Sequence, residues 1–460
     1  MTTLVNEHIS ANSTSPDDWK YVSEGGATIV FSYRGPPHSV FSGTVLRLRK
    51  ARHELNIDVP WQPDSKPLAP DSVLAEGEEE EPDDPSISFQ QKVTSRLIEP
   101  EFLPRLETVL VERTWLEILR VSSEKDRPLE RRTKDEIDVN RRKGVLATDL
   151  VGGDGWAVEI KPKWGFLPNT EHLSSETREN KSRHCRFCMH TQYRGGRGES
   201  AFHGYCPLDL FSGNEERVAY ALRCLWKAWI TSDGTINNLK IFARGELVVP
   251  QESSEKLRKF ISVPSNGIKE DELMEGFVKA LLPLLTRTPV LQRIAHLQRS
   301  LDALDIEGLQ SLHSVYAQAH FPDSPGTIAS LENLFPDPSL DDWDRFVSAY
   351  KSQQPIVDLD PEHLRHHTMA YLLSATFKDC SIILHLGRNP EVPDSITVID
   401  LDPKSMKRLR KWAELDHDIA MSFVDDGSQV CYDELNCCRL GRILSNRLPP
   451  LTHHGLVFST

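Results

Sequence analysis

The sequence predicts a mixed α/β (α+β) fold in two lobes, with a larger, helix-rich lobe at the C-terminal end. Residues 19–48 alternate between apolar strand patterns and a glycine turn, whereas residues 268–320 carry apolar residues at helical spacing. Between them, Gly152, Gly153 and Gly155 form a flexible connection that we interpret as a hinge. A chain of 460 residues, 38% of them apolar and 27% charged, is long enough for such a two-lobed globular protein.

The chain divides into three parts on this interpretation. Residues 1–18 form a short flexible lead, residues 19–150 the N-terminal lobe and residues 151–460 the C-terminal lobe. Residues 51–94 inside the first lobe are rich in proline and then in acid, so that like charges repel and no core can form. We therefore predict a disordered insertion there.

Composition excludes several classes of protein. No apolar run approaches the roughly 20 residues that a bilayer-spanning helix needs, and the N-terminus lacks a secretory signal pattern. Eight cysteines without such a signal suit free thiols in a reducing compartment, so we expect the nucleus, the cytoplasm or both. The net charge of -14 argues against a general nucleic-acid coat, although a local basic pocket remains compatible with it. We expect a monomer that requires neither a membrane nor a nucleic acid.

The first strands carry a candidate phosphate site. Residues 19–33 read as strand, glycine turn and strand, and residues 42–48 as a further strand. Gly25 and Gly26 in the turn would let backbone N–H groups approach a phosphate closely, and Arg47 on the next strand could reach the same group. Most turns of this kind only connect strands, so both interpretations stay open on spacing alone.

The rest of the N-terminal lobe reads as one helix over residues 95–123, a basic loop over residues 126–132 and a strand over residues 145–150.

Lys161 and Lys163 lie in an apolar stretch, residues 158–166, that reads as a strand ending at a turn. In an extended segment, side chains two residues apart share one face, so Glu159 and both lysines should point the same way. Pro162 favours this geometry because the residue before a proline avoids the helical region. A highly charged ligand would explain the charges, and so would a solvated edge strand in which lysine discourages aggregation.

A basic segment at residues 180–197 has two further interpretations. Four residues have the spacing of zinc ligands, with His184 and His190 as alternates: Cys185, Cys188, His203 and Cys206. Alternatively, Phe187 and Tyr193 between the basic residues could stack nucleic-acid bases.

The C-terminal lobe continues with a helix over residues 215–231 and a strand over residues 235–242. Further elements are expected as follows: two or more helices over 268–320, a proline-rich linker over 321–338, a helix over 339–351 with Ser339 as N-cap, and a helix over 361–371.

Two final strands, residues 375–384 and 397–402, carry carboxylates at their ends. Asp400 and Asp402 are two residues apart, and a helix is expected to follow with Lys404, Arg408 and Lys411 at positions i, i+4 and i+7. Strand-end acids beside a basic helical face match phosphoryl transfer, in which acids hold Mg²⁺ and cations hold phosphates. The alternative is an ordinary hairpin beside a solvated helix.

Taken together, the motifs resemble the inositol-pentakisphosphate 2-kinases, with a fungal member as the expected match. The matching stretches occur in the family's order: residues 24–27, 159–166, 186–190, 207–212, 378–381 and 399–401. The Glu-Ile-Lys-Pro-Lys string from Glu159 is the most specific. The resemblance implies a two-lobed inositol-phosphate kinase fold, distantly like protein kinases. It also implies transfer of the ATP γ-phosphate to the 2-hydroxyl of inositol 1,3,4,5,6-pentakisphosphate, which gives the hexakisphosphate, phytate.

The resemblance also implies roles for particular residues. Asp379 orients and deprotonates the 2-hydroxyl, Lys161 lies beside the reacting phosphate, and Asp400 binds Mg²⁺. ATP is held by Gly25, Gly26, Arg47, Glu159 and Asn237. The inositol phosphate is held by Arg131, Lys163, Arg194, Asn238, Lys404 and Arg408. ATP and inositol pentakisphosphate are thus the expected partners, and substrate binding is expected to close the lobes. A non-catalytic inositol-phosphate or RNA-binding module with a structural zinc remains the alternative.

Overall fold

A computed structural model describes most of the chain. The described residues are 9–53, 81–153, 155–199, 204–259, 261, 270–320, 335–352, 363–387, 393–425, 427, 431 and 433. Among them, no helix combines the length and the hydrophobicity that crossing a bilayer requires.

The N-terminal lobe is built on an antiparallel sheet in the order β1-β2-β3-β6-β4, with β5 paired to β3. Its strands are β1 Trp19–Glu24, β2 Thr28–Tyr33, β3 Thr44–Arg52, β4 Leu106–Leu110, β5 Asp135–Ile137 and β6 Lys143–Thr148. Helix α2, Arg113–Ser123, packs on one face, where Trp115 and Leu116 join Trp19 and Phe31 in the core. The strands predicted within residues 19–48 and 145–150 are confirmed.

The helix predicted over residues 95–123 is wrong in its first half. The chain instead forms two single turns, η3 Thr94–Arg96 and η4 Pro100–Phe102, and then β4 before α2 begins. Pro100 and Pro104 lack the N–H that a continuing helix would donate, so the backbone leaves the helical path there. The basic loop contains the turn η5 Glu124–Asp126 and the short helix α3 Leu129–Arg132.

Two segments expected to lack structure are partly folded. Within the predicted flexible lead, η1 Ala11–Ser13 and η2 Pro16–Asp18 are capped by serine side chains. Within the predicted insertion, β3 continues to Arg52 and helix α1 spans Pro85–Lys92, while residues 54–80 lie outside the described residues. The helix was not predicted because Asp84 was counted with the repelling acidic charges, whereas it acts as the N-cap of α1.

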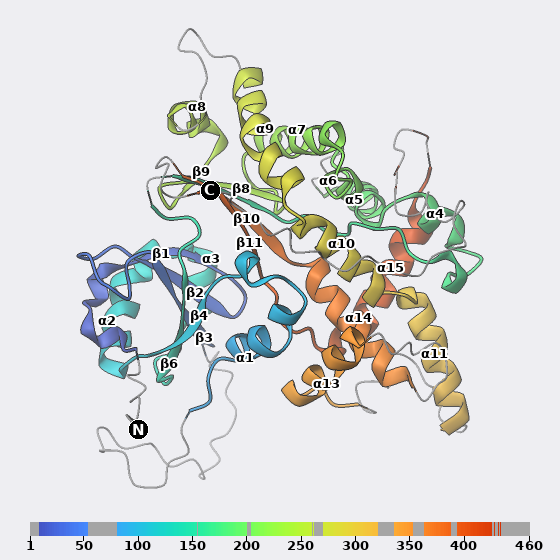
Figure 1. Cartoon of the computed structure of the whole chain (residues 1–460), viewed down its shortest axis with the longest axis horizontal. Helices are drawn as coiled ribbons and strands as arrows, with labels where there is room; N and C mark the ends of the chain where they lie inside the picture. The colour runs from blue at the N-terminus through green and yellow to red at the C-terminus, as the bar shows by residue number, and fades with distance from the viewer. Residues whose placement is uncertain are drawn as a thin grey trace, which may run out of the picture.

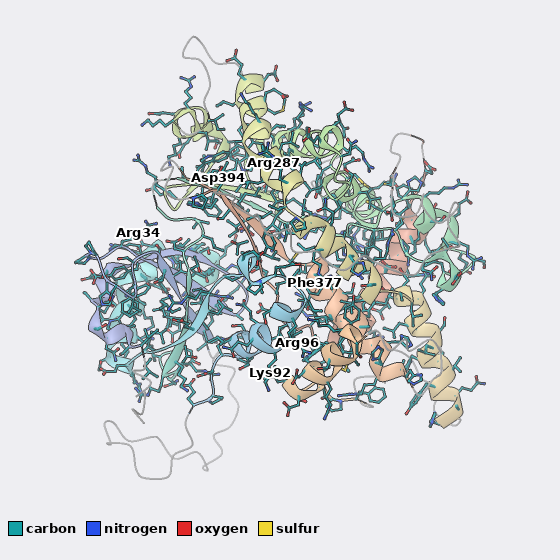
Figure 2. All side chains as sticks on the ribbon, in the orientation of Figure 1. Arg34, Lys92, Arg96, Arg287, Phe377 and Asp394 are labelled. Atoms are coloured by element: carbon teal, nitrogen blue, oxygen red, sulfur yellow. The ribbon has the colours of Figure 1, made fainter. Side chains whose placement is uncertain are left out.

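Helix α1 packs against the C-terminal lobe although it belongs to the N-terminal half of the sequence. Phe89 meets Trp343 edge-to-face at 5.8 Å, and both side chains lie in the large core of the C-terminal lobe. Arg96 donates to Asp344 at 2.6 Å. Figure 2 shows Lys92 and Arg96 side by side at this boundary, next to α13 Leu340–Lys351.

The C-terminal lobe contains a second antiparallel sheet, in the order β11-β10-β7-β8-β9. Its strands are β7 Trp156–Ile160, β8 Leu239–Ala243, β9 Glu246–Val248, β10 Ser381–Leu386 and β11 Ser395–Ile399. All five residues of β7 are buried and β7 lies at the centre of the sheet. The interpretation of this stretch as a solvated edge strand is therefore wrong.

Helices cover this second sheet and extend away from it (Figure 1). They are η6 Thr170–His172, α4 Arg178–Arg183, α5 Arg186–Gly196, α6 Pro207–Leu210, α7 Glu215–Thr231, α8 Pro250–Arg258, α9 Glu270–Arg287, α10 Val290–Leu301, α11 Asp305–His320, α13, α14 Leu364–Lys378, η9 Met406–Arg408 and α15 Leu409–Ser422. The helix over residues 215–231 and the Ser339 cap are confirmed, the latter with a complete capping box. Residues 321–334 of the predicted linker lie outside the described residues.

Two boundaries near the C-terminal end differ from the sequence-based expectation. The strand predicted from Ala375 begins only at Ser381, because α14 continues to Lys378 with apolar side chains buried on both sides. The single basic helix predicted to carry Lys404, Arg408 and Lys411 is also wrong. Lys404 precedes η9, and α15 begins at Leu409, so the three residues do not share one helical face.

Candidate active site

A cavity of about 630 Å³ separates the two sheets. Its apolar walls come from both lobes. The first sheet contributes Val30, Val45 and Ala147, and the second sheet contributes Phe242, Ile383 and Val398. The connection at Asp149, Leu150 and Val151 also lines it. A cavity of this size with apolar side chains on two sides can hold a small ligand such as a purine base.

A second, polar cavity of about 260 Å³ adjoins the first. Both cavities are lined by Gly25, Arg47, Lys161 and Asp400, so they are continuous. The second cavity brings residues from distant segments together: Gly26, Ala27, Thr28, Arg49, Asp84, Ser86, Val145, Asp379, Asp402 and Lys404. Carboxylates, lysines and a glycine turn thus surround one small volume.

Lys161 is fixed at the base of this second cavity. Its Nζ donates to Asp400 Oδ2 at 2.9 Å, and Ser381 Oγ donates to the same oxygen at 3.0 Å. Its backbone continues the sheet by one step, since its N–H donates to the carbonyl of Asn238 at 3.0 Å. Burial lowers the pKa of Lys161, but the negative charge of Asp400 outweighs this, so the pKa lies above its ordinary value. Lys161 therefore stays cationic.

Asp400 has the matching electrostatics. Burial raises the pKa of Asp400, and the ammonium of Lys161 more than reverses that effect, so the carboxyl stays ionised. Its backbone φ of 61° directs the chain sharply out of β11. Asp402 follows two residues later and lines the same volume. Two carboxylates at such a position have the chemistry of a Mg²⁺ site.

Asp379 lies at the C-terminal end of α14 with its side chain 57% exposed. Lys404 donates to its Oδ2 at 2.8 Å. The carboxylate is therefore both oriented and accessible, as a group that accepts a proton from a substrate must be.

Lys163 does not extend the strand geometry predicted for it. Strand β7 ends at Ile160, and Lys163 has a φ of 68°, in the left-handed region. The predicted shared strand face of Lys161 and Lys163 is therefore wrong. Burial lowers the pKa of Lys163, and the charge of Asp379 partly opposes this effect.

The remaining predicted residues divide between this cleft and its surroundings. Glu159, Asn237 and Arg131 line the larger cavity, and Glu159 accepts from Lys240 at 3.1 Å. Asn238 and Arg194 line a third cavity, of about 230 Å³, which Asn237 joins to the first.

Arg194 and Arg408 lie farthest from the expected arrangement. Arg194 donates to Glu199 at 2.7 Å, and Arg408 is exposed and lines none of these three cavities. The predicted nucleotide-binding and catalytic residues thus line the first two cavities, whereas Arg194 and Arg408 lie outside both.

The family model of the inositol-pentakisphosphate 2-kinases matches residues 21–418, which includes every residue of this cleft. The chain belongs to the inositol-pentakisphosphate 2-kinase family. The chain is 34% identical over 423 residues to the inositol-pentakisphosphate 2-kinase of Cryptococcus neoformans, with 88% of this chain and 93% of the relative covered. The corresponding proteins of Arabidopsis thaliana and Danio rerio are 27% and 26% identical, each with 92% of the relative covered.

Family membership confirms the predicted activity. The protein is an ATP-dependent phosphotransferase that acts on inositol pentakisphosphate and yields phytate. The alternative of a non-catalytic binding module is wrong.

Sequence reasoning missed two charged residues of the polar cavity, Arg49 and Asp84. Arg49 lines the polar cavity and forms a bidentate pair with Asp84, at 2.6 and 2.9 Å. A signal was available for Arg49, because it lies two residues after Arg47 on the same strand and therefore on the same face. Nothing in the acidic run distinguished Asp84 from its neighbours.

The zinc-ligand prediction needs a correction in this kinase. Four buried cysteines gather: Cys185, Cys188, Cys206 and Cys431. Cys431 takes the place expected for His203, which lies outside the described residues. The two alternate histidines are elsewhere. His184 faces Asp425 at 3.1 Å, and His190 lines the third cavity, where burial lowers its pKa to about 4.

Proposed function

We propose that this kinase binds the base of ATP between its two sheets and the ATP phosphates beside the Gly25–Gly26 turn. The observation that carries the proposal is the continuity of the larger cavity with the polar cavity that holds Lys161, Asp379 and Asp400. Arg47 lines both volumes and would contact the phosphates where they cross from one to the other.

Asp400 and Asp402 would hold Mg²⁺. The metal, when bound, neutralises charge on the nucleotide phosphates. Lys161, which stays cationic, would stabilise the negative charge that spreads over the transferred phosphoryl group. Asp379 would accept the proton of the 2-hydroxyl as the new oxygen–phosphorus bond forms, and Lys404 holds its carboxylate in place for that step.

The inositol phosphate would lie at the mouth of the polar cavity. Arg131, Arg194 and Lys404 line the three cavities, as does Asn238. Lys163 and Arg408 line none of them and would have to join these cations when the substrate binds. Five phosphates need many converging cations, since no single lysine or arginine can neutralise them. Arg194 would have to leave Glu199 to take part, so substrate binding and closure of this surface are coupled in the proposal.

Replacement of Asp379 tests the assignment. Asp379→Asn keeps the size of the side chain and removes the proton acceptor, so kcat should fall by about 10²–10⁴. Calorimetric affinities for ATP and for inositol pentakisphosphate should stay within a few-fold. Asp394→Asn is the matched control, because Asp394 precedes β11 and its carboxylate only caps the N–H of Gly387 at 3.1 Å. Nearly intact turnover in Asp379→Asn would contradict the catalytic assignment.

A structural zinc is a second proposal, and the four-cysteine group carries it. Sulfur–sulfur distances are 3.1 Å for Cys185–Cys188, 3.7 Å for Cys185–Cys206 and 3.9 Å for Cys206–Cys431. Zinc–sulfur bonds of about 2.3 Å in a tetrahedron place the sulfurs about 3.8 Å apart, so the residues fit the metal with small adjustments. Zinc would tie the segment around Cys431 to α5 and α6, and would contribute folding free energy rather than catalysis.

Metal analysis of the purified protein distinguishes zinc from a cluster of thiols. We expect about one zinc per chain, which Cys431→Ser loses together with several degrees of thermal stability. Cys224→Ser is the control, since Cys224 is half-buried outside the cluster. A stable, active and zinc-free preparation would overturn this second proposal.

A further inference from the structure

We propose that Gln298, on α10, is a positioning residue that sets Lys163 relative to Asp379. This inference rests on the substrate and proton-accepting roles proposed above for those two residues. Gln298 touches neither cavity of the cleft. It acts through the backbone of the two segments that carry them.

The amide of Gln298 is fully used. The side chain is 0% exposed, and its Nε2 donates to the carbonyl of Lys163 and to the carbonyl of Phe377, both at 2.9 Å. Its Oε1 accepts from the N–H of Gly165 at 2.7 Å. The partners fix the amide orientation, because the reversed amide would set its oxygen against two carbonyls.

Both carbonyls lack a partner in regular structure without this amide. Phe377 lies in the last turn of α14, where the helix offers its carbonyl no N–H donor. Lys163 lies beyond the end of β7 in the left-handed conformation. A carbonyl without a partner is unfavourable in such a packed setting, so Gln298 stabilises this arrangement of turn and helix end. Lys163 is held directly, and Asp379 follows Phe377 by two residues.

A second contact from the same helix reinforces the first. Asp302, the C-cap of α10 one turn after Gln298, accepts from Lys378 Nζ at 2.5 Å. The same ammonium lies 4.1 Å from the ring centre of Trp164 and 4.6 Å from that of Tyr371. Lys378 is the residue before Asp379, and Trp164 is the residue after Lys163. Two side chains at the C-terminal end of α10, Gln298 and Asp302, therefore hold the turn at Lys163 and the end of α14 in place relative to each other.

Figure 2 shows Phe377 near the middle of the molecule, where this helix end approaches the second sheet. The surrounding core is fully buried, so a shift of the turn would require the helices themselves to move. A misplacement of about 1 Å between reacting groups can cost a factor of about 100 in rate.

Gln298→Met tests the inference because it keeps the shape of the side chain and removes its three hydrogen bonds. We expect kcat to fall about 10- to 100-fold per ATP-binding molecule, with the dissociation constant for ATP unchanged within about twofold. Thr368→Val is the matched control. Thr368 is equally buried on α14, and its hydroxyl bonds only to Leu364 of its own helix, at 2.7 Å. Its kcat per ATP-binding molecule should stay within twofold of wild type.

Counting active molecules by bound ATP separates positioning from stability, since a purely structural defect lowers the number of competent molecules and not their kcat. Unchanged kcat in Gln298→Met, or an equal loss in Thr368→Val, would overturn the inference.

Gln298→Glu is the second test variant if Gln298→Met does not fold. Its carboxylate accepts from Gly165 but cannot donate to either carbonyl, so the same loss of kcat is expected and full kcat overturns the proposal. Asp379→Asn is measured alongside. If it stays active, the proposed site fails; if it is inactive while Gln298→Met is fully active, only the positioning role fails.

Discussion

At the scale of single residues, Lys161 and Lys163 show what a short motif can and cannot predict. Their charge follows from residue types alone, and Lys161 does pair with a carboxylate, that of Asp400, at 2.9 Å. The turn at Lys163, with its positive φ, does not follow from residue types, because its carbonyl is bonded by Gln298, which is 135 residues away in the chain. Cys431 was missed for the same reason. A metal-ligand motif is recognised by short spacing between its residues, and Cys431 is 225 residues beyond Cys206.

The two lysines should differ when each is replaced. Lys161→Met should lower kcat strongly with little change in the KM for inositol pentakisphosphate, because Lys161 pairs with Asp400 and, in the proposed mechanism, faces the transferring phosphate. Lys163→Met should mainly raise that KM. Steady-state kinetics at saturating ATP measure both effects. Equal defects in the two variants would remove the division of roles.

Substrate affinity should depend on pH through Lys163. Burial holds its pKa below the ordinary value of 10.5, and only the cationic form attracts phosphate. Affinity is therefore complete below that lowered pKa and is lost as pH rises through it. Calorimetry of inositol pentakisphosphate binding between about pH 7 and 10 should show a wild-type weakening that Lys163→Met lacks and that the exposed-lysine control Lys351→Met retains. Parallel curves for wild type and Lys163→Met would contradict this origin.

At the scale of elements, the sequence predicts a helix end correctly where neighbouring residues alone determine it. Ser339 and Asp342 cap α13 with hydrogen bonds to each other's backbone, so the sequence contains the whole cause. Helix α1 is different. It exists because Ile87 and Phe89 are buried, the latter against Trp343, more than 250 residues later. The boundary between α14 and β10 likewise depends on burial of the helix end by α10.

Phe89→Ala should therefore destabilise the protein strongly. Loss of a buried ring costs about 3–5 kcal/mol, and here it also loosens α1 from α13. Ile118→Ala on α2 is the control, since Ile118 is 56% exposed and should change stability little. Denaturation midpoints in urea, followed by tryptophan fluorescence, measure the difference. Similar midpoints for the two variants would show that α1 contributes little to the core.

At the scale of the whole molecule, the kinase places its cleft between two sheets joined by the short connection after β6. Gly155 in this connection has no room for a side chain, because an added Cβ would lie 2.4 Å from the carbonyl oxygen of Leu386. The strands before this connection and the helix-rich region after it were predictable from the change of pattern along the chain. The assignment of α1 to the second lobe was not, since chain order alone places it in the first.

Closure of the lobes around both substrates should protect the cleft from protease. We expect endoproteinase Asp-N, which cuts before aspartate, to cut the connection between the lobes at Asp149 or Asp154. This cut should be slower in the presence of inositol pentakisphosphate and a non-hydrolysable ATP analogue than in the presence of either alone. Arg131→Ala should lose part of this protection, because Arg131 reaches the cleft from the N-terminal lobe. Identical digestion patterns with and without ligands would argue against closure.

The order of strands in the second sheet also governs how the protein is made. Strand β7 pairs on one side with β8, which follows within about 80 residues, and on the other with β10, which is synthesised more than 220 residues later. The first sheet needs only residues 19–148 and can assemble while the ribosome is still translating the rest. Until β10 has been synthesised, β7 lacks its partner on one side, and until α13 has been synthesised, the apolar side chains of α1 stay exposed. Chaperone demand during synthesis should therefore concentrate on nascent chains that end between β7 and β10.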